Sequence, residues 1–319
     1  MKEKIENFPK QLKFKPELKN DRKWALKERY LLVGMGGSHL QGDILKALLP
    51  DFPLSIHSDY GLPSLISENT GIIIASFSGN TAEAIDALEV AIERKISVAV
   101  IAKGGTLLEI AKKEGIPYIQ LKEEDIQPRH ALGYSVKALL SLFNMEELSR
   151  KIEKVSKKLE EKQENLRKSG KRTAKIMEDK IPIIYSSQRN YALSYNWKIK
   201  FNETSKIPGF YNLIPELNHN EMTGFDITKN TKKLSQKMIF IFLRDNEDDL
   251  RNQKRMDVTA SLFKERGLDV LDIEVEGKTR IEKIFTSLLF ADWISYYLAQ
   301  YYGVVIEDVP MVEEFKKMI

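Results

Sequence analysis

Short apolar runs alternate with stretches of helical periodicity along the first half of the chain. Apolar runs of strand length occupy residues 30–33, 54–57, 72–75, 98–102 and 118–121. Residues 40–49, 81–94 and 106–114 lie between them and place apolar side chains at the three- and four-residue spacing of a helix. This alternation predicts a parallel β-sheet with helices on both faces.

A second alternating region follows a segment that is dense in both signs of charge. Residues 146–180 predict one or two long helices, with Ser169-Gly170 as a possible break. Further on, the pattern predicts strands at 181–185, 237–243 and 270–275 and helices at 191–203 and 278–302. We therefore expect an α/β protein with two doubly wound domains, residues 1–148 and residues 149–319, the second opening with a linker helix.

Composition narrows the class of protein. The chain has 319 residues, of which 42% are hydrophobic and 30% charged, and its net charge is +4. That surplus is small for a nucleic-acid-binding protein, and acidic residues interrupt the basic ones in the 146–180 segment. The chain has no cysteine, which excludes disulfides and thiolate chemistry. With no signal peptide and no apolar run of membrane length, we expect a cytoplasmic protein without a membrane partner.

The turn after the 72–75 strand carries candidate chemistry. Ser76, Ser78 and Thr81 supply three hydroxyls, and Gly79 lets a ligand approach the backbone closely. A helix start also presents unpaired N–H groups and the positive end of its dipole, so a phosphate suits this position. The alternative is an ordinary helix cap, for which Ser, Asn and Thr are the usual residues.

The glycine turn after the first strand resembles a dinucleotide fingerprint only in part. Its third glycine position is occupied by His39, and no Walker lysine follows. A loop that contacts a sugar hydroxyl through the Gly37 N–H and Ser38 fits better. No histidine has the spacing of a metal site, so we predict no metal and assign His39, His57 and His130 to structure.

Three further motifs complete the set: Pro128-Arg129, Asn202-Glu203-Thr-Ser-Lys206 and Asn218-His219-Asn220-Glu221. Together with the two turns, they resemble the sugar isomerase (SIS) domains, and in particular the bifunctional phosphoglucose/phosphomannose isomerases. The resemblance implies two SIS domains per chain, a homodimer and no cofactor.

The resemblance also implies roles for individual residues. Ser76, Ser78 and Thr81 would hold the substrate phosphate. Glu203 would be the catalytic base, and Arg129 would lie near the enediolate. His219 would open the sugar ring from across the dimer interface.

The chemistry of aldose–ketose isomerisation needs groups of these types. A carboxylate must reach the carbon acid, a cation must stabilise the oxygen that gains charge, and a histidine can exchange a proton near neutral pH. Each residue also has a structural alternative: Glu203 as a solvated helix acid, His219 as a core or interface histidine and Arg129 as a surface ion-pair partner. Glu216 and Glu221 are rival carboxylates for the base.

We therefore expect an isomerase that interconverts glucose 6-phosphate and fructose 6-phosphate, with mannose 6-phosphate as a further substrate. Near the C-terminus, Glu307 stands where the family often has a threonine associated with acceptance of the mannose epimer. One alternative is a non-catalytic regulatory module that binds a sugar phosphate. Another is a related isomerase acting on an amino sugar or another phosphosugar.

Overall fold

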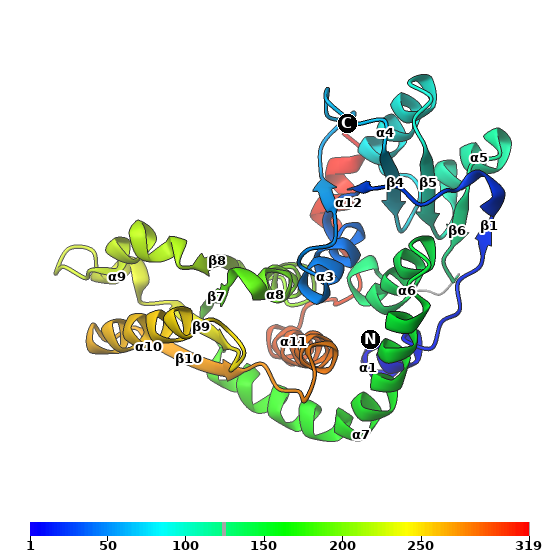
Figure 1. Ribbon diagram of the computed structural model, residues 1–319. Coiled ribbons are helices and arrows are strands. Elements are labelled where there is room, and N and C mark those ends of the chain that lie inside the picture. The colour runs from blue at the N-terminus through cyan, green and yellow to red at the C-terminus, as the bar shows by residue number, and fades with distance from the viewer. Residues whose placement is uncertain (123–125, 319) are drawn as a thin grey trace. The chain divides into compact units, whose positions relative to one another are not determined.

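The computed structural model describes residues 1–122 and 126–318. The chain divides into two compact units, each treated separately below. The N-terminal unit is Glu6–Glu160, and the C-terminal unit combines Met1–Ile5 with Glu161–Ile319. Each unit contains one β-sheet (Figure 1).

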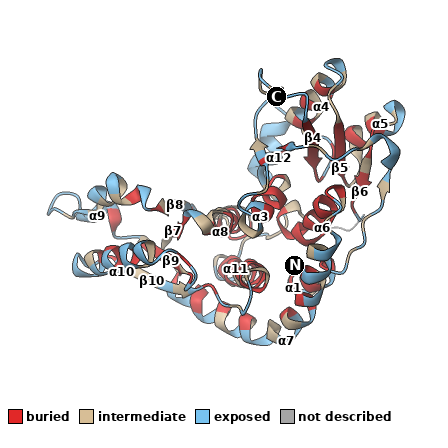
Figure 2. Ribbon diagram, in the orientation of Figure 1, coloured by how far each residue is buried: buried red, intermediate tan, exposed pale blue. Residues whose placement is uncertain are grey.

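The sheet of the N-terminal unit has the strand order β1-β6-β5-β4-β2-β3. All neighbouring strands pair in parallel except β1, which is antiparallel to β6. The strands are β1 (Leu18–Lys19), β2 (Arg29–Val33), β3 (Leu54–His57), β4 (Thr70–Ser76), β5 (Val98–Ala102) and β6 (Tyr118–Gln120). The central strands β4 and β5 are buried along their whole length (Figure 2), as expected for strands covered on both faces.

Helices cover both faces of this sheet (Figure 1). The helices are α2 (Phe8–Gln11), α3 (Leu40–Leu48), α4 (Ala82–Glu93), α5 (Gly105–Glu114) and α6 (Leu132–Leu142), with short 3₁₀ turns η1 (Asp21–Lys23), η2 (Gly36–Ser38) and η3 (Pro128–His130). Ile72 and Ile74 of β4 form one core with α4 and α5. On the opposite face, Gly42 of α3 lies directly against Leu32 and Ile56. Within β2, Leu31 and Val33 belong to the first core and Leu32 faces α3, so alternate residues of one strand reach the two faces of the sheet.

The sheet of the C-terminal unit is fully parallel, with the strand order β10-β9-β7-β8. The strands are β7 (Ile181–Ser187), β8 (Phe210–Ile214), β9 (Met238–Arg244) and β10 (Asp269–Glu274). The helical elements are η4 (Gln188–Asn190), α8 (Tyr191–Glu203), η5 (Glu216–His219), η6 (Glu221–Phe225), α9 (Lys232–Ser235), α10 (Leu250–Glu265), α11 (Arg280–Tyr302) and α12 (Pro310–Lys316), and the short α1 (Lys2–Glu6) begins the chain. Tyr185, Phe240 and Phe242 of the sheet pack with Phe263 of α10 in an aromatic core.

The charged segment forms one helix, α7 (Glu146–Ile176), so of the two outcomes left open the single helix is the one observed, with no break at Ser169-Gly170. Gly170 is buried inside the helix, and a Cβ there would lie 2.6 Å from the Cβ of Trp293 on α11. The glycine therefore permits close packing of two helices and does not end one.

The predicted α/β class is confirmed, and so are the parallel sheets. The strand β8 was not foreseen: its sequence Phe-Tyr-Asn-Leu-Ile lies between the Asn202–Lys206 and Asn218–Glu221 motifs, in a stretch for which no element was predicted. No helix among the described residues is long and apolar enough to cross a membrane.

Candidate functional site

In the N-terminal unit, the glycine turn, the hydroxyl turn and the Pro-Arg turn meet at the carboxyl edge of the sheet. We define the hydroxyl turn as residues 76–81, between β4 and α4. Its Phe77 N–H donates to Ser38 Oγ at 3.1 Å. A Cβ on Gly37 would lie 3.2 Å from Pro128 Cβ and 3.4 Å from the Arg129 nitrogen. Three segments distant in sequence are therefore in contact where open α/β sheets bind ligands.

The hydroxyl turn is organised around Ser76. The Ser76 Oγ lies 2.7 Å from Thr81 Oγ1 and accepts the Gly79 N–H at 3.1 Å. The Ser78 hydroxyl is more exposed and accepts the Asn80 N–H at 3.2 Å. A hydroxyl hydrogen can rotate, so these side chains can redirect donors toward an anion at the start of α4.

Gly79 fixes the shape of this turn. Its φ is +75°, and a Cβ there would lie 1.8 Å from the carbonyl oxygen of Gly104. The neighbouring Gly105 also has a positive φ and lies against the Asn80 side chain. The pair Gly104-Gly105 after β5 was not singled out from the sequence, although two adjacent glycines after an apolar run are a signal for close backbone approach.

Arg129 brings a cation to the same edge. It belongs to η3 and is only 2% exposed. In the low dielectric of a buried site, the charge of a guanidinium interacts more strongly with a neighbouring charge than it would in water. The six predicted substrate-contacting residues of this unit thus lie in three turns that touch one another: Gly37, Ser38, Ser76, Ser78, Thr81 and Arg129.

In the C-terminal unit, Glu203 is the last residue of α8. The Lys206 ammonium donates to the backbone carbonyl of Glu203, and Lys206 itself has a positive φ of 56°. One turn earlier, Lys200 forms an ion pair with Asp292 of α11. The end of α8 is therefore fixed on both sides of Glu203.

His219 ends the 3₁₀ turn η5 and is exposed within its unit. The neighbouring Asn218 donates to Thr259 Oγ1 at 2.8 Å, which anchors this turn to α10. Of the rival carboxylates, Glu221 accepts the Tyr185 hydroxyl at 2.5 Å and an N–H from Asn212. Glu216 accepts from the Asn220 amide at 2.8 Å. Glu221 thus has a structural role at the edge strand.

Similarity to known proteins shows which family this chain belongs to. A family model described as the bacterial phospho-glucose isomerase C-terminal SIS domain matches residues 166–319. A bifunctional phosphoglucose/phosphomannose isomerase from Caldicellulosiruptor bescii is 32% identical over 95% of this chain and 94% of its own length. The chain belongs to the bifunctional phosphoglucose/phosphomannose isomerase family.

Two further relatives show how broad the surrounding group is. A D-glucosamine-6-phosphate 4-epimerase from Sulfolobus acidocaldarius is 29% identical over 61% of this chain and 63% of its own length. The solved tagatose-6-phosphate ketose/aldose isomerase from Escherichia coli superposes with a TM-score of 0.72 at 15% identity, covering 96% of this chain and 95% of that one. The latter likeness supports the fold, which is that of the SIS-type isomerases.

The C-terminal SIS domain of this family member has an acidic turn where the N-terminal unit has the hydroxyl turn. Residues 245–249 lie between β9 and α10, just as residues 77–81 lie between β4 and α4, and read Asp-Asn-Glu-Asp-Asp. The capping positions correspond, with Thr81 before α4 and Asp249 before α10. Because carboxylates repel anions, a phosphate is suited to the first turn and not to the second.

The acidic turn is neutralised from within the C-terminal unit. Asp245 Oδ1 lies 2.6 Å from Lys283 Nζ, and its Oδ2 lies 2.9 Å from Arg280 Nη1. Burial alone would raise the pKa of Asp245, but the hydrogen bonds from Lys283 and others hold that pKa below its ordinary value. Asp248 accepts from Ser187 Oγ at 2.7 Å, yet burial raises its pKa. No sequence signal pointed to this network, since its members come from three separate segments, around Ser187, Asp245 and Lys283.

The remaining candidate residues have contacts of their own. His39 Nδ1 lies 2.8 Å from Asp43 Oδ2 inside the N-terminal unit, and His57 Nε2 lies 3.4 Å from the Tyr60 carbonyl. Glu307, in the C-terminal unit, accepts from the Met1 amino group at 2.9 Å. Within residues 1–122 and 126–318, no group of three or more His, Asp or Glu side chains is arranged to hold a metal ion.

Proposed function

We propose that this protein is an aldose–ketose isomerase that interconverts glucose 6-phosphate and fructose 6-phosphate and also accepts mannose 6-phosphate. The observation that carries the proposal is the cluster of hydroxyl turn, glycine turn and Arg129 in a chain related at 32% identity to a bifunctional isomerase. The hydroxyl turn and the start of α4 hold the phosphate. Arg129 lies beside the reacting end of the sugar.

Glu203 acts as the base in this scheme. Its carboxylate takes the proton from C2 of the open-chain aldose, and the electron pair forms a C1–C2 double bond. The former aldehyde oxygen gains the negative charge, which Arg129 stabilises. Return of the proton to C1, with transfer of a proton from O2 to O1, gives the ketose. Reprotonation of the same cis-enediol on the other face of C2 gives the mannose epimer.

His219 opens the ring by giving a proton to the ring oxygen as the bond from that oxygen to C1 breaks, while the C1 hydroxyl releases its proton to water and becomes the aldehyde. This role suits a group whose ordinary pKa lies near neutrality. We propose that His219 reaches the site from the partner subunit of a homodimer. Its exposure within its own unit supports this arrangement. A positioned acid or base contributes roughly 10²–10⁴-fold, so phosphate binding supplies part of the remaining acceleration through orientation.

The deciding experiment is solvent deuterium uptake at C2 or C1, followed by NMR, with each of the three hexose 6-phosphates. The proposal expects uptake and interconversion with all three, without added nucleotide. Binding without uptake would favour the non-catalytic module instead. Retention of full activity by a monomer at high dilution would contradict the role of His219 across an interface.

A second candidate function is supported by the 4-epimerase relative, whose substrate is an amino sugar phosphate. The same hydroxyl turn suits that phosphate equally well. Glucosamine 6-phosphate should therefore be included in the assay. Turnover of the amino sugar above that of glucose 6-phosphate would favour this candidate over the first.

A further inference from the structure

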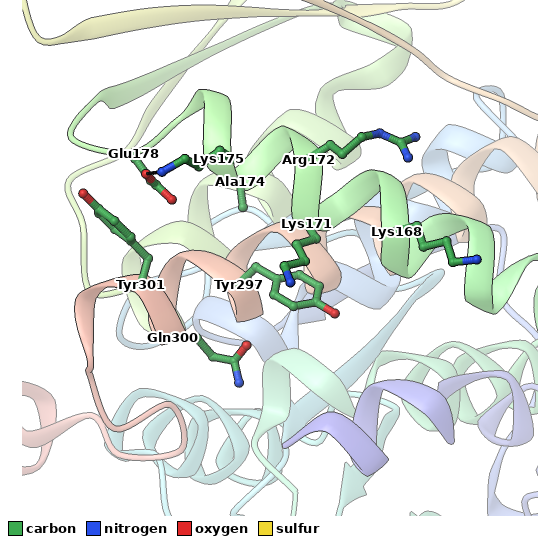
Figure 3. Close-up of a pocket in the computed structure, with 9 residues that line it drawn as sticks. All are labelled: Lys168, Lys171, Arg172, Ala174, Lys175, Glu178, Tyr297, Gln300 and Tyr301. Atoms are coloured by element: carbon green, nitrogen blue, oxygen red, sulfur yellow. Dashed lines mark hydrogen bonds and ion pairs between the residues drawn. The ribbon is translucent and has the colours of Figure 1, made fainter.

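A groove between α7 and α11 lies within the C-terminal unit and contains none of the proposed catalytic residues (Figure 3). Its volume is about 630 Å³. That size is within the range of small-molecule sites, which is roughly 300–1,000 Å³. The groove is lined by Lys168, Lys171, Arg172, Ala174, Lys175, Glu178, Tyr297, Gln300 and Tyr301.

One wall of the groove is a row of cations. Lys168, Lys171 and Lys175 follow one another at spacings of three and four residues, which places them along one face of α7. With Arg172, the lining has four basic side chains and a single carboxylate, Glu178, which pairs with Lys175 at 2.5 Å. Lys168 lies 3.4 Å from Glu164, which is outside the lining. In the described part of the chain, no carboxylate pairs with Lys171. The groove therefore presents an excess of positive charge.

The facing wall is aromatic. Tyr297 and Tyr301 are one turn apart on α11, and Tyr301 is 47% exposed. The Lys171 ammonium lies 5.9 Å from the centre of the Tyr297 ring, and Lys175 lies 5.8 Å from that of Tyr301. Figure 3 shows each lysine beside its tyrosine. Tyr297 also stacks on the buried Trp293, with ring centres 6.2 Å apart, so its position is fixed.

We propose that this groove binds a nucleoside polyphosphate, with the phosphates along the cations of α7 and the flat base against the tyrosines of α11. Lys175 lies seven positions after Lys168 on α7, which corresponds to about 10 Å along the helix axis. This spacing suits several linked phosphates, whereas a single phosphate would contact one or two of the cations. Phenol rings stack with nucleobases, and Gln300 adds an amide able to pair with a base edge.

Two other occupants fit the charges less well. A second copy of the chain placed on this groove by a two-fold axis would set the lysine row against itself, with like charges in contact. A nucleic-acid strand needs a longer basic track than this groove provides, and the chain's net charge is only +4. The substrate phosphate has its own proposed place on the N-terminal unit, so the groove is a separate site.

The test is isothermal titration calorimetry of the full-length protein with ATP, without magnesium and at low ionic strength. Saturating fructose 6-phosphate is present so that the hydroxyl turn is occupied. We expect one ATP per chain, with binding that weakens as salt is added. The double variant Lys168→Gln/Lys171→Gln should weaken ATP binding at least tenfold. The matched control is Lys154→Gln, an exposed lysine of α7 outside the groove, which should change binding less than twofold.

A second variant tests the aromatic wall. Tyr301→Leu should weaken ATP binding several-fold and leave the binding of inorganic triphosphate unchanged. Absence of ATP binding, or equal binding by the double variant and the unaltered protein, would overturn the proposal. Tighter binding of a single-stranded oligonucleotide than of ATP, or loss of dimerisation in the double variant, would also overturn it and assign the groove to nucleic acid or to a second copy.

Discussion

Lys200 and Asp292 form an ion pair of 2.6 Å in which both side chains are only 2% exposed. Lys200 also donates to the Leu288 carbonyl at 2.8 Å. The pair joins α8 to α11 three residues before Glu203, the proposed base. A buried pair of this kind holds a geometry more than it adds net stability, because desolvation offsets the attraction between the charges.

Removing one partner of this ion pair should lower the free energy of unfolding far more than removing both partners. Lys200→Met removes the cation that faces the buried Asp292 carboxylate, which should reduce the free energy of unfolding by about 3–5 kcal/mol. The double variant Lys200→Met/Asp292→Leu should recover most of that loss. Urea denaturation of both proteins measures the difference. An equal loss of unfolding free energy in the single and double variants would show that Lys200 and Asp292 do not offset each other's burial cost.

The assignment of the base among three glutamates can be tested by parallel substitutions. Glu203→Gln should lower kcat by about 10²–10⁴-fold with little change in stability, because it removes the proton acceptor. Glu221→Gln should mainly reduce the melting temperature, since Glu221 accepts from Tyr185 and Asn212. Steady-state kinetics and thermal unfolding of both variants measure this contrast. Full turnover by Glu203→Gln would assign the base to another residue.

The conformation of the hydroxyl turn should require glycine at position 79, whereas Gly36 should tolerate alanine, although both glycines have a positive φ. A Cβ on Gly79 would overlap the Gly104 carbonyl, whereas a Cβ on Gly36 would meet nothing within 4 Å. Gly36→Ala should therefore lower the free energy of unfolding by about 1–2 kcal/mol, which is the cost of a left-handed backbone conformation for a residue with a Cβ. Gly79→Ala should cost more and should also raise the KM for fructose 6-phosphate. Similar melting temperatures for the two variants would mean that the turn adapts easily.

The acidic turn should make stability depend on pH through Asp248. Burial raises the folded-state pKa of this group, so the folded protein binds its proton more tightly than the unfolded chain. Its contribution is therefore fully present below the unfolded pKa of about 3.9 and is lost as the pH rises through the folded pKa.

Asp248→Asn removes this titration, so the stability of the variant relative to the unaltered protein should increase as the pH rises from about 4 toward neutrality. Thermal unfolding at several pH values measures the trend. Asp245→Asn is the matched comparison, because the folded-state pKa of Asp245 is lowered. Its contribution is present above the unfolded pKa and lost at acid pH, so this variant should lose stability relative to the unaltered protein as the pH rises. The same trend in both variants would contradict the assignment.

The sequence predicted those helices, strands and turns that can be recognised from residues close together along the chain. Apolar runs such as 72–75 and 98–102 are strands because they are buried on both faces of a parallel sheet. The order strand, hydroxyl-rich turn, helix at Ser76–Thr81 also followed from residue type alone. Gly170 shows the limit of this reasoning: a glycine in a charged stretch left one or two helices open, and only the tertiary structure, in which Gly170 packs against Trp293, shows that the helix continues.

By itself, then, the sequence determined the α/β class and the hydroxyl turn, because periodicity and turn chemistry are properties of neighbouring residues, and its motifs carried the resemblance to the family. Only the tertiary structure decided that Gly37, Phe77 and Pro128 belong to one edge, and that Lys200 is neutralised by Asp292. It also decided that the second sheet carries a self-neutralised acidic turn in the place of a phosphate site. These relationships join residues dozens of positions apart, and their energies arise from burial, which exists only once the chain has folded.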